Sequence, residues 1–206
     1  MKRLLLEQEI KTFLHVKQVY NMKTHNILII VDAQNDFITG SLANKEAQKA
    51  VPKIVELINS QEWDAIIATQ DTHYNTYLET KEGQSLPIEH CIRNTEGWKI
   101  NSDILLATFN SSAKEYQKIE KNTFGYLDIC QEVLDIVHGA PYTDEYNITI
   151  VGFCTDICVI SNALILKAGY YSNGNIYVKA DCCAGVTPES HEAALTVMRS
   201  CQINII

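Results

Sequence analysis

The chain has 206 residues, 46% of them hydrophobic and 20% charged, which fits one globular domain and excludes a disordered, collagen-like or coiled-coil protein. Its 17 basic and 25 acidic side chains give a formal net charge of −8, so we expect no nucleic-acid partner, because nucleic-acid binding needs clustered Lys and Arg. No apolar run is long enough to span a bilayer, so we expect no membrane partner either.

Seven cysteines and the start of the chain bear on the cellular setting. The apolar run at 4–6 is too short for a signal peptide and is followed by acidic residues. We therefore interpret the cysteines as thiols of a cytoplasmic protein, not as a disulfide framework. Residues 1–25 are predicted to be a non-catalytic N-terminal extension, and residues 26–206 a single domain.

From there on, short apolar runs alternate with stretches of helical spacing. The run at 27–31 is apolar throughout, as expected of a strand buried on both faces. The predicted strands lie at 27–31, 65–68, 117–120, 148–151, 176–178 and 203–206. The predicted helices lie at 46–58, 126–137 and 156–168, and another opens at 187–189. Such alternation predicts a parallel sheet with helices on both faces.

Ligand sites in such sheets lie beyond the carboxyl ends of the strands, so we expect functional residues directly after the strands. Asp32 follows the first strand, where a buried carboxylate is costly unless it is paired or used. It either bonds to a neighbouring loop or transfers protons. Lys121 follows the third strand and is either a solvated charge or the partner of an anionic pair.

The fourth strand leads to Thr155, a suitable N-cap, which places Cys158 in a first helical turn. The helix dipole there favours an anion, so we expect a lowered thiol pKa and a better nucleophile. The alternative is that Cys158 is a small core residue, the usual role of a free cysteine.

Metal-ligand residue types follow the second strand. Asp71 and His73 are two residues apart and face the same way in an extended segment. With Glu79 and His90 downstream, they predict a divalent metal site, with zinc favoured and manganese or iron as alternatives. The other interpretation is a polar loop whose histidines cap turns. We expect no organic cofactor.

Together these segments resemble the isochorismatase-like cysteine hydrolases, and within them the nicotinamidase branch. The matching parts are 32–37, 71–73, 90–92 with Thr95 and Gly97, Lys121, and 152–159. The resemblance runs from about residue 26 to the C-terminus. It implies a three-layer α/β/α fold with a six-stranded, mainly parallel sheet.

The resemblance also implies roles for single residues. A catalytic Asp–Lys–Cys triad is matched by Asp32, Lys121 and Cys158. A non-proline cis peptide bond would fall between Phe153 and Cys154, and the backbone amides of Cys154 and Cys158 would form the oxyanion hole.

The implied metal ligands match Asp71, His73 and His90. A third histidine that is common in the family is absent, and Glu79 stands at a fitting place, with Glu82 as a weaker candidate.

Three side chains are expected to line the substrate pocket: Phe37, Leu86 and Phe153. Leu86 stands before Pro87, where nicotinamidases of the family often carry an aromatic residue, and an extra residue separates Pro87 from His90. This departure argues against an aromatic ring substrate, although Phe37 supplies one aromatic wall.

The predicted function is hydrolysis of a small-molecule amide, nicotinamide to nicotinate and ammonia, through a thioester on the cysteine, by a homo-oligomer. The alternatives are a hydrolase of another small amide or ureido compound, an isochorismatase, or a non-catalytic small-molecule-binding domain. A nucleotide-binding protein is disfavoured, because neither a G-x-G-x-x-G motif nor a P-loop occurs.

Overall fold

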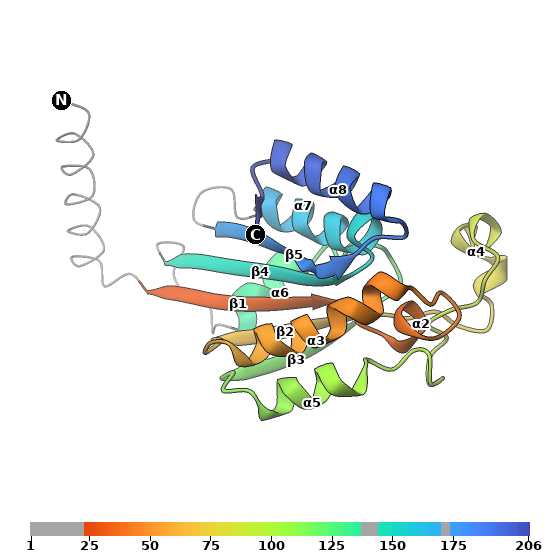
Figure 1. The fold of residues 1–206 in the computed structure, drawn as a ribbon, viewed down its shortest axis with the longest axis horizontal. Coiled ribbons are helices and arrows are strands. Elements are labelled where there is room, and N and C mark those ends of the chain that lie inside the picture. Colours follow the sequence, from red (N-terminus) through yellow and green to blue (C-terminus); the bar gives the residue numbers. More distant parts are fainter. Residues whose placement is uncertain (1–22, 137–143, 170–173) are drawn as a thin grey trace.

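The computed structural model describes residues 23–136, 144–169 and 174–206. Most of the predicted extension at 1–25 and the last residue of the helix predicted at 126–137 lie outside this part. The described strands form one parallel sheet in the order β3-β2-β1-β4-β5-β6 (Figure 1). The strands are β1 (Thr24–Val31), β2 (Ala65–Asp71), β3 (Glu115–Lys121), β4 (Glu145–Phe153), β5 (Gly174–Ala184) and β6 (Asn204–Ile205). The predicted six-stranded α/β/α architecture is confirmed.

Helices cover both faces of the sheet (Figure 1). The longer ones are α3 (Lys45–Asn59), α5 (Ser102–Asn110), α6 (Ile129–Ile136), α7 (Ile160–Gly169) and α8 (Pro188–Ser200). The shorter ones are α2 (Asn35–Ile38), the 3₁₀ turn η1 (Tyr77–Glu79), α4 (Lys81–Ser85) and the π-helical turn η2 (Thr155–Val159).

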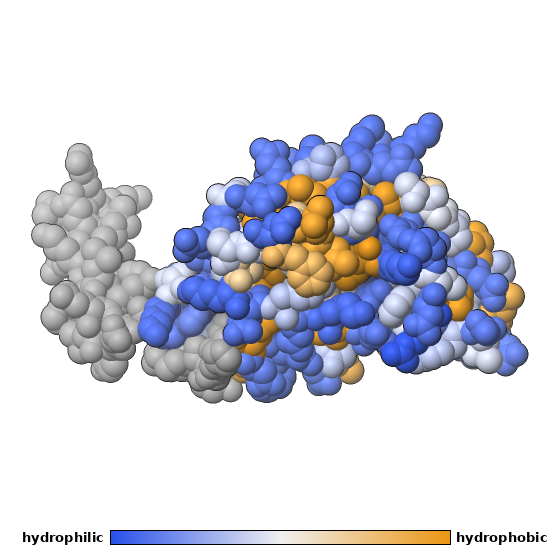
Figure 2. Space-filling view, turned by 90° about the horizontal axis from the view of Figure 1, so that it is seen from below, coloured by the Kyte–Doolittle hydropathy of each residue, from blue (hydrophilic) through white to orange (hydrophobic). Residues whose placement is uncertain are grey.

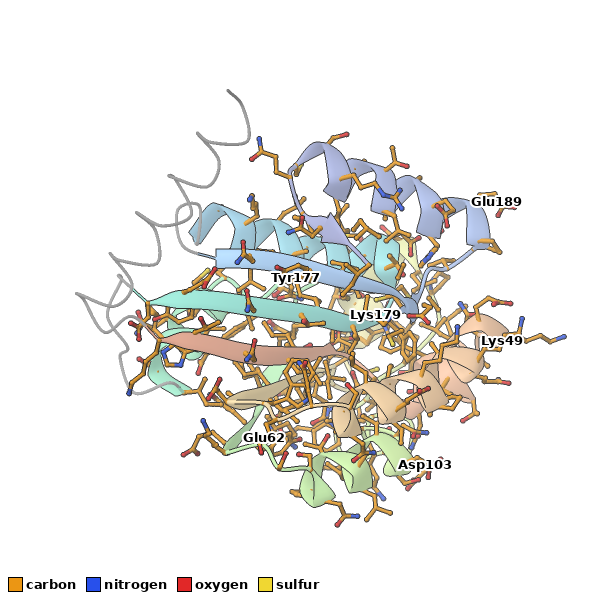
Figure 3. All side chains as sticks on the ribbon, turned by 60° about the vertical axis from the view of Figure 1, so that its left-hand side comes forward. Lys49, Glu62, Asp103, Tyr177, Lys179 and Glu189 are labelled. Atoms are coloured by element: carbon orange, nitrogen blue, oxygen red, sulfur yellow. The ribbon has the colours of Figure 1, made fainter. Side chains whose placement is uncertain are left out.

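Alternate residues of β1 point to opposite layers. Ile27 and Ile29 pack with residues of α6, α7 and α8, whereas Leu28 and Ile30 pack with residues of α3 and α5. This period of two is the reason why a central strand is apolar throughout. The outer faces of the helices are polar: Lys49, Asp103 and Glu189 point away from the sheet (Figure 3).

Helix α8 begins as predicted and α5 was not predicted. The Thr187 side chain accepts a hydrogen bond from the Ser190 amide, and a proline stands in the first turn. Asn101 caps α5 in a similar way, by accepting from the Asp103 amide. The buried side of α5 is small, since the helix has only nine residues, so its apolar periodicity is weak.

The outer surface has an apolar area on the face seen from below (Figure 2). Leu106 and Phe109 of α5 are among the exposed large apolar side chains, at 61% and 67% exposure. None of the described helices has the length and apolarity needed to cross a membrane. The seven cysteines all lie in the described part and form no disulfide with one another, as predicted.

Candidate active site

The carboxyl ends of three neighbouring strands bring two carboxylates and one ammonium group together. Asp71 ends β2 and pairs in register with Lys121 of β3, and Asp32 follows β1. The Nζ atom of Lys121 lies 2.7 Å from Oδ2 of Asp32 and 3.9 Å from Oδ1 of Asp71. The side chains of Lys121 and Asp32 are 1% and 0% exposed, so this ion pair is shielded from water.

The backbone and one neighbour fix the orientation of Asp32. Its φ of 46° lies in the left-handed region, which aspartate tolerates better than most residues. The Thr69 hydroxyl donates to Oδ1 at 2.7 Å, and the Asp32 amide donates to the Thr69 carbonyl at 3.2 Å. One carboxylate oxygen is therefore anchored, while the other faces Lys121.

Cys158 reaches the same place from the end of β4. The peptide bond between Phe153 and Cys154 is cis, as the family resemblance implies, and η2 follows it. The Cys158 side chain is buried, and Nζ of Lys121 lies 3.8 Å from its sulfur. The structure thus brings Asp32, Lys121 and Cys158 together from three segments that are far apart in the chain.

Burial and the neighbouring charges together determine the acid–base behaviour of these groups. Burial raises the pKa of Asp32 and outweighs the opposing effect of Lys121. Burial alone would lower the pKa of Lys121, but the neighbouring Asp32, Cys158 and Asp71 raise it. Burial and the neighbouring Asp32 raise the pKa of the Cys158 thiol well above its ordinary value. The expectation of a lowered thiol pKa was therefore wrong, because it considered the helix dipole alone.

Next to this cluster, Asp71, His73 and His90 form a group whose ligand atoms all lie within 4.8 Å of one another. Oδ2 of Asp71 is 3.0 Å from Nε2 of His73 and 3.6 Å from Nε2 of His90. Nδ1 of His90 lies 2.9 Å from the Ile88 carbonyl, which can only accept a hydrogen bond. In the neutral ring this leaves the Nε2 lone pair of His90 for a ligand.

The acidic partner of the two histidines is Glu82 and not Glu79. Oε1 of Glu82 is 3.6 Å from Nε2 of His73 and 3.8 Å from Nε2 of His90. Glu79 is exposed on η1. Thr80 caps α4 by accepting from the Gly83 amide, so the chain turns directly after Glu79 and its side chain stays outside. The predicted ligand is corrected accordingly.

The donor set fits a divalent metal ion. Two imidazole nitrogens and two carboxylates are combined, a set typical of zinc sites. The buried Nε2 of His73 faces these carboxylates, 3.0 Å from Oδ2 of Asp71, but forms no hydrogen bond of good geometry within the described part of the chain. A cation at this place would satisfy it.

A pocket of about 1020 Å³ opens in front of the sulfur. Its apolar lining includes Phe37, Leu42, Leu86, Phe124 and Ile157, and its polar lining includes Asp71, Glu82, His90 and Cys158. The predicted wall Phe153 is wrong: it is fully buried and packs in the core with α3 and α5 residues, because the alternation of β4 turns it to that layer. Phe124, which was not predicted, lines the pocket instead.

The comparisons with known proteins agree with this geometry. The family model of the isochorismatase domain matches residues 26–206. The chain belongs to the isochorismatase family.

Within this isochorismatase-family chain, similarity to nicotinamidases covers most of the residues. The Schizosaccharomyces pombe nicotinamidase is 28% identical over an alignment of 214 residues that includes 90% of this chain and 94% of the relative. The Saccharomyces cerevisiae nicotinamidase is 31% identical, with 69% and 80% covered. A solved structure of the Pyrococcus horikoshii pyrazinamidase in complex with zinc is 26% identical, covers 88% of this chain and 98% of that one, and has a TM-score of 0.67. The predicted nicotinamidase branch is confirmed.

Proposed function

We propose that this chain is a cysteine-dependent amidohydrolase that converts nicotinamide to nicotinate and ammonia. The observation that carries the proposal is the meeting of Asp32, Lys121 and Cys158, with Cys158 in the lining of the pocket. Similarity to nicotinamidases supports the choice of substrate.

In the first half of the reaction, Asp32 takes the proton of the Cys158 thiol, and the sulfur attacks the carboxamide carbon. A raised pKa suits Asp32 to this task, because a stronger base takes the proton of a weakly acidic thiol more readily. The carbonyl oxygen becomes an oxyanion that faces the backbone amides of Cys154 and Cys158. Loss of one such donor typically costs about 2.7–4 kcal/mol of transition-state stabilisation.

Asp32 then gives its proton to the amide nitrogen, the C–N bond breaks, and ammonia leaves. A thioester on Cys158 remains. In the second half Asp32 takes a proton from water, whose oxygen attacks the thioester carbon. The C–S bond then breaks, the carboxylic acid product leaves, and Asp32 returns the proton to the sulfur. Lys121 stays protonated throughout, because its raised pKa keeps the charge that holds Asp32 in place.

We infer that Asp71, His73, His90 and Glu82 hold a divalent ion, with zinc favoured over manganese or iron. Once bound there, a divalent ion would supply a positive charge that polarises and orients the substrate. We further propose that residues 26–206 form the single hydrolase domain and that residues 1–25 are a non-catalytic extension. A homo-oligomeric state and a cytoplasmic location stay predictions.

Ammonia release from nicotinamide by wild type, Cys158→Ala and Cys201→Ala tests the proposal. Cys201 is a matched control, because it is half-buried just after α8 and takes no part in the pocket. We expect release by wild type and Cys201→Ala and none by Cys158→Ala. Undiminished release by Cys158→Ala would overturn the thioester route.

A second candidate is hydrolysis of a bulkier amide by the same residues. The pocket volume is slightly above the roughly 300–1,000 Å³ that is usual for small-molecule sites, so it has room beyond one pyridine ring. A panel of aromatic and aliphatic amides separates the two: the second candidate requires Cys158-dependent ammonia release from a larger amide and little from nicotinamide.

A further inference from the structure

Asn162 joins two segments of the candidate active site. It lies one helical turn beyond Cys158, on α7, and is fully buried. Its Oδ1 accepts a hydrogen bond from the Tyr126 amide at 3.0 Å. Its Nδ2 donates to the Cys158 carbonyl at 2.8 Å and to the Phe124 carbonyl at 3.3 Å. One side chain therefore ties the loop after β3 to the turn that carries the sulfur.

The tied loop carries two parts of the site. It starts at Lys121, whose Nζ also donates to the Thr123 carbonyl at 2.9 Å. It continues to Phe124, which lines the pocket and is 49% exposed. A displacement of this loop would move both the carbonyl that binds the ammonium group and one wall of the pocket.

The loop backbone lies directly against α7. A Cβ atom added to Gly125 would come within 2.7 Å of Cδ1 of Ile165 and 3.1 Å of Cβ of Ser161. The absence of a side chain at Gly125 thus permits the close approach that the Asn162 hydrogen bonds require. The helix itself is irregular here, since η2 is a π-helical turn, a feature often found at functional sites.

We propose that Asn162 is a positioning residue, which sets the spacing between Lys121 and Cys158 and holds Phe124 against the pocket. Its three hydrogen bonds use both the oxygen and the nitrogen of the buried amide, and the bond to the Cys158 carbonyl is itself buried. For its kinetic consequences the proposal rests on the amidohydrolase function proposed above.

The test compares Asn162→Ala with Asn147→Ala. Asn147 is a matched control at the amino end of β4, where its Nδ2 donates to Asn26 at 3.2 Å, far along the strand from the pocket. We expect Asn162→Ala to lower kcat/KM by about 100-fold, with KM raised and kcat lowered, as a small misplacement of reacting groups does. Asn147→Ala should leave both constants within about twofold of wild type while lowering Tm.

The split between kcat and KM separates positioning from mere structural support. A structural residue changes the amount of folded enzyme, which lowers apparent kcat and leaves KM unchanged; that result would overturn the proposal. In addition, Asn162→Ala should raise KM less in the Phe124→Ala background than in the wild-type background, because both substitutions affect the same wall of the pocket.

A second variant and a hydrogen-exchange measurement test the proposal even if Asn162→Ala does not fold. Gly125→Ala places a methyl group against Ile165 and Ser161 of α7. It should change kcat and KM in the same directions by less, so it replaces Asn162→Ala if that variant does not fold. Hydrogen exchange of the amides at 122–126 should speed up in both variants. If hydrogen exchange speeds up in the variants but the wild type hydrolyses no amide, the proposed function is refuted and the positioning role is not. If exchange in the variants is unchanged, the positioning role is refuted.

Discussion

Two Asp–Lys ion pairs of similar length stand at opposite ends of the sheet. Before β2 and β3, Nζ of Lys114 lies 2.5 Å from Oδ1 of Asp64, with the side chains 69% and 20% exposed. Beyond the other ends of the strands, Nζ of Lys121 lies 2.7 Å from Asp32, with 1% and 0% exposed.

The pKa values of the two acids shift in opposite directions, although the lysine lowers the pKa in both pairs. Partial burial would raise the pKa of Asp64, but hydrogen bonds from Lys114 and the Asn26 amide lower it. Burial raises the pKa of Asp32 in spite of Lys121. Exposure to water, and not the N–O distance, thus distinguishes an ion pair that only stabilises the fold from one that is suited to proton transfer.

The largest effect that distinguishes the pairs is expected for the two lysines. Lys121→Ala leaves Asp32 buried without its cation, so we expect about 10²–10⁴-fold lower activity and a loss of about 3–5 kcal/mol in the free energy of unfolding. Lys114→Ala should leave activity unchanged and shift the urea midpoint far less. Equal losses in ammonia release and in urea unfolding for the two variants would erase the distinction between the pairs.

A smaller effect is expected at the group of candidate metal ligands. This group adjoins the buried Asp32–Lys121 pair, because Asp71 contacts Lys121 and both histidines. Glu82→Gln should weaken zinc binding by at least about tenfold, because it removes one anionic oxygen ligand. Glu79→Gln, three residues earlier and exposed, is the matched control and should bind zinc as wild type does. Titration against a coloured chelator measures both affinities. Equal weakening by Glu79→Gln would restore the original ligand assignment.

The smallest effect concerns the exposed pair. The pKa of Asp64 in the folded chain lies below its ordinary value of 3.8, so its carboxylate adds stability that is fully present above that value and is lost as the pH falls through the folded pKa. The stability difference between wild type and Asp64→Asn should therefore shrink on acidification in this range, and high salt should reduce it. A difference that grows towards low pH in urea unfolding would reverse the assigned sign.

Much of the fold is readable from the sequence because the central strands are apolar on both faces. The four strand ends that meet at the site follow from the same pattern, since parallel strands present their carboxyl ends at one edge. Helix α8 is marked by Thr187 and Pro188, a local signal that needs no tertiary context.

Other features depend on contacts that the sequence does not record. The side to which Phe153 turns is fixed by the register of β4, and the choice of Glu82 over Glu79 by where α4 begins. The raised pKa of the Cys158 thiol needs the distance to Asp32 and the degree of burial. Asn162 carries no motif at all; its role arises from bonds to a loop 36 and 38 positions away.

The central claim is that the sulfur of Cys158 bonds covalently to the substrate carbon. Mass spectrometry of the enzyme, quenched in acid during the first turnover of nicotinamide, tests it directly. The account predicts a pyridine-carbonyl adduct on the peptide that contains Cys158, formed before nicotinate is released. Turnover with no adduct at any time point, or with the acyl group on another residue, would contradict it.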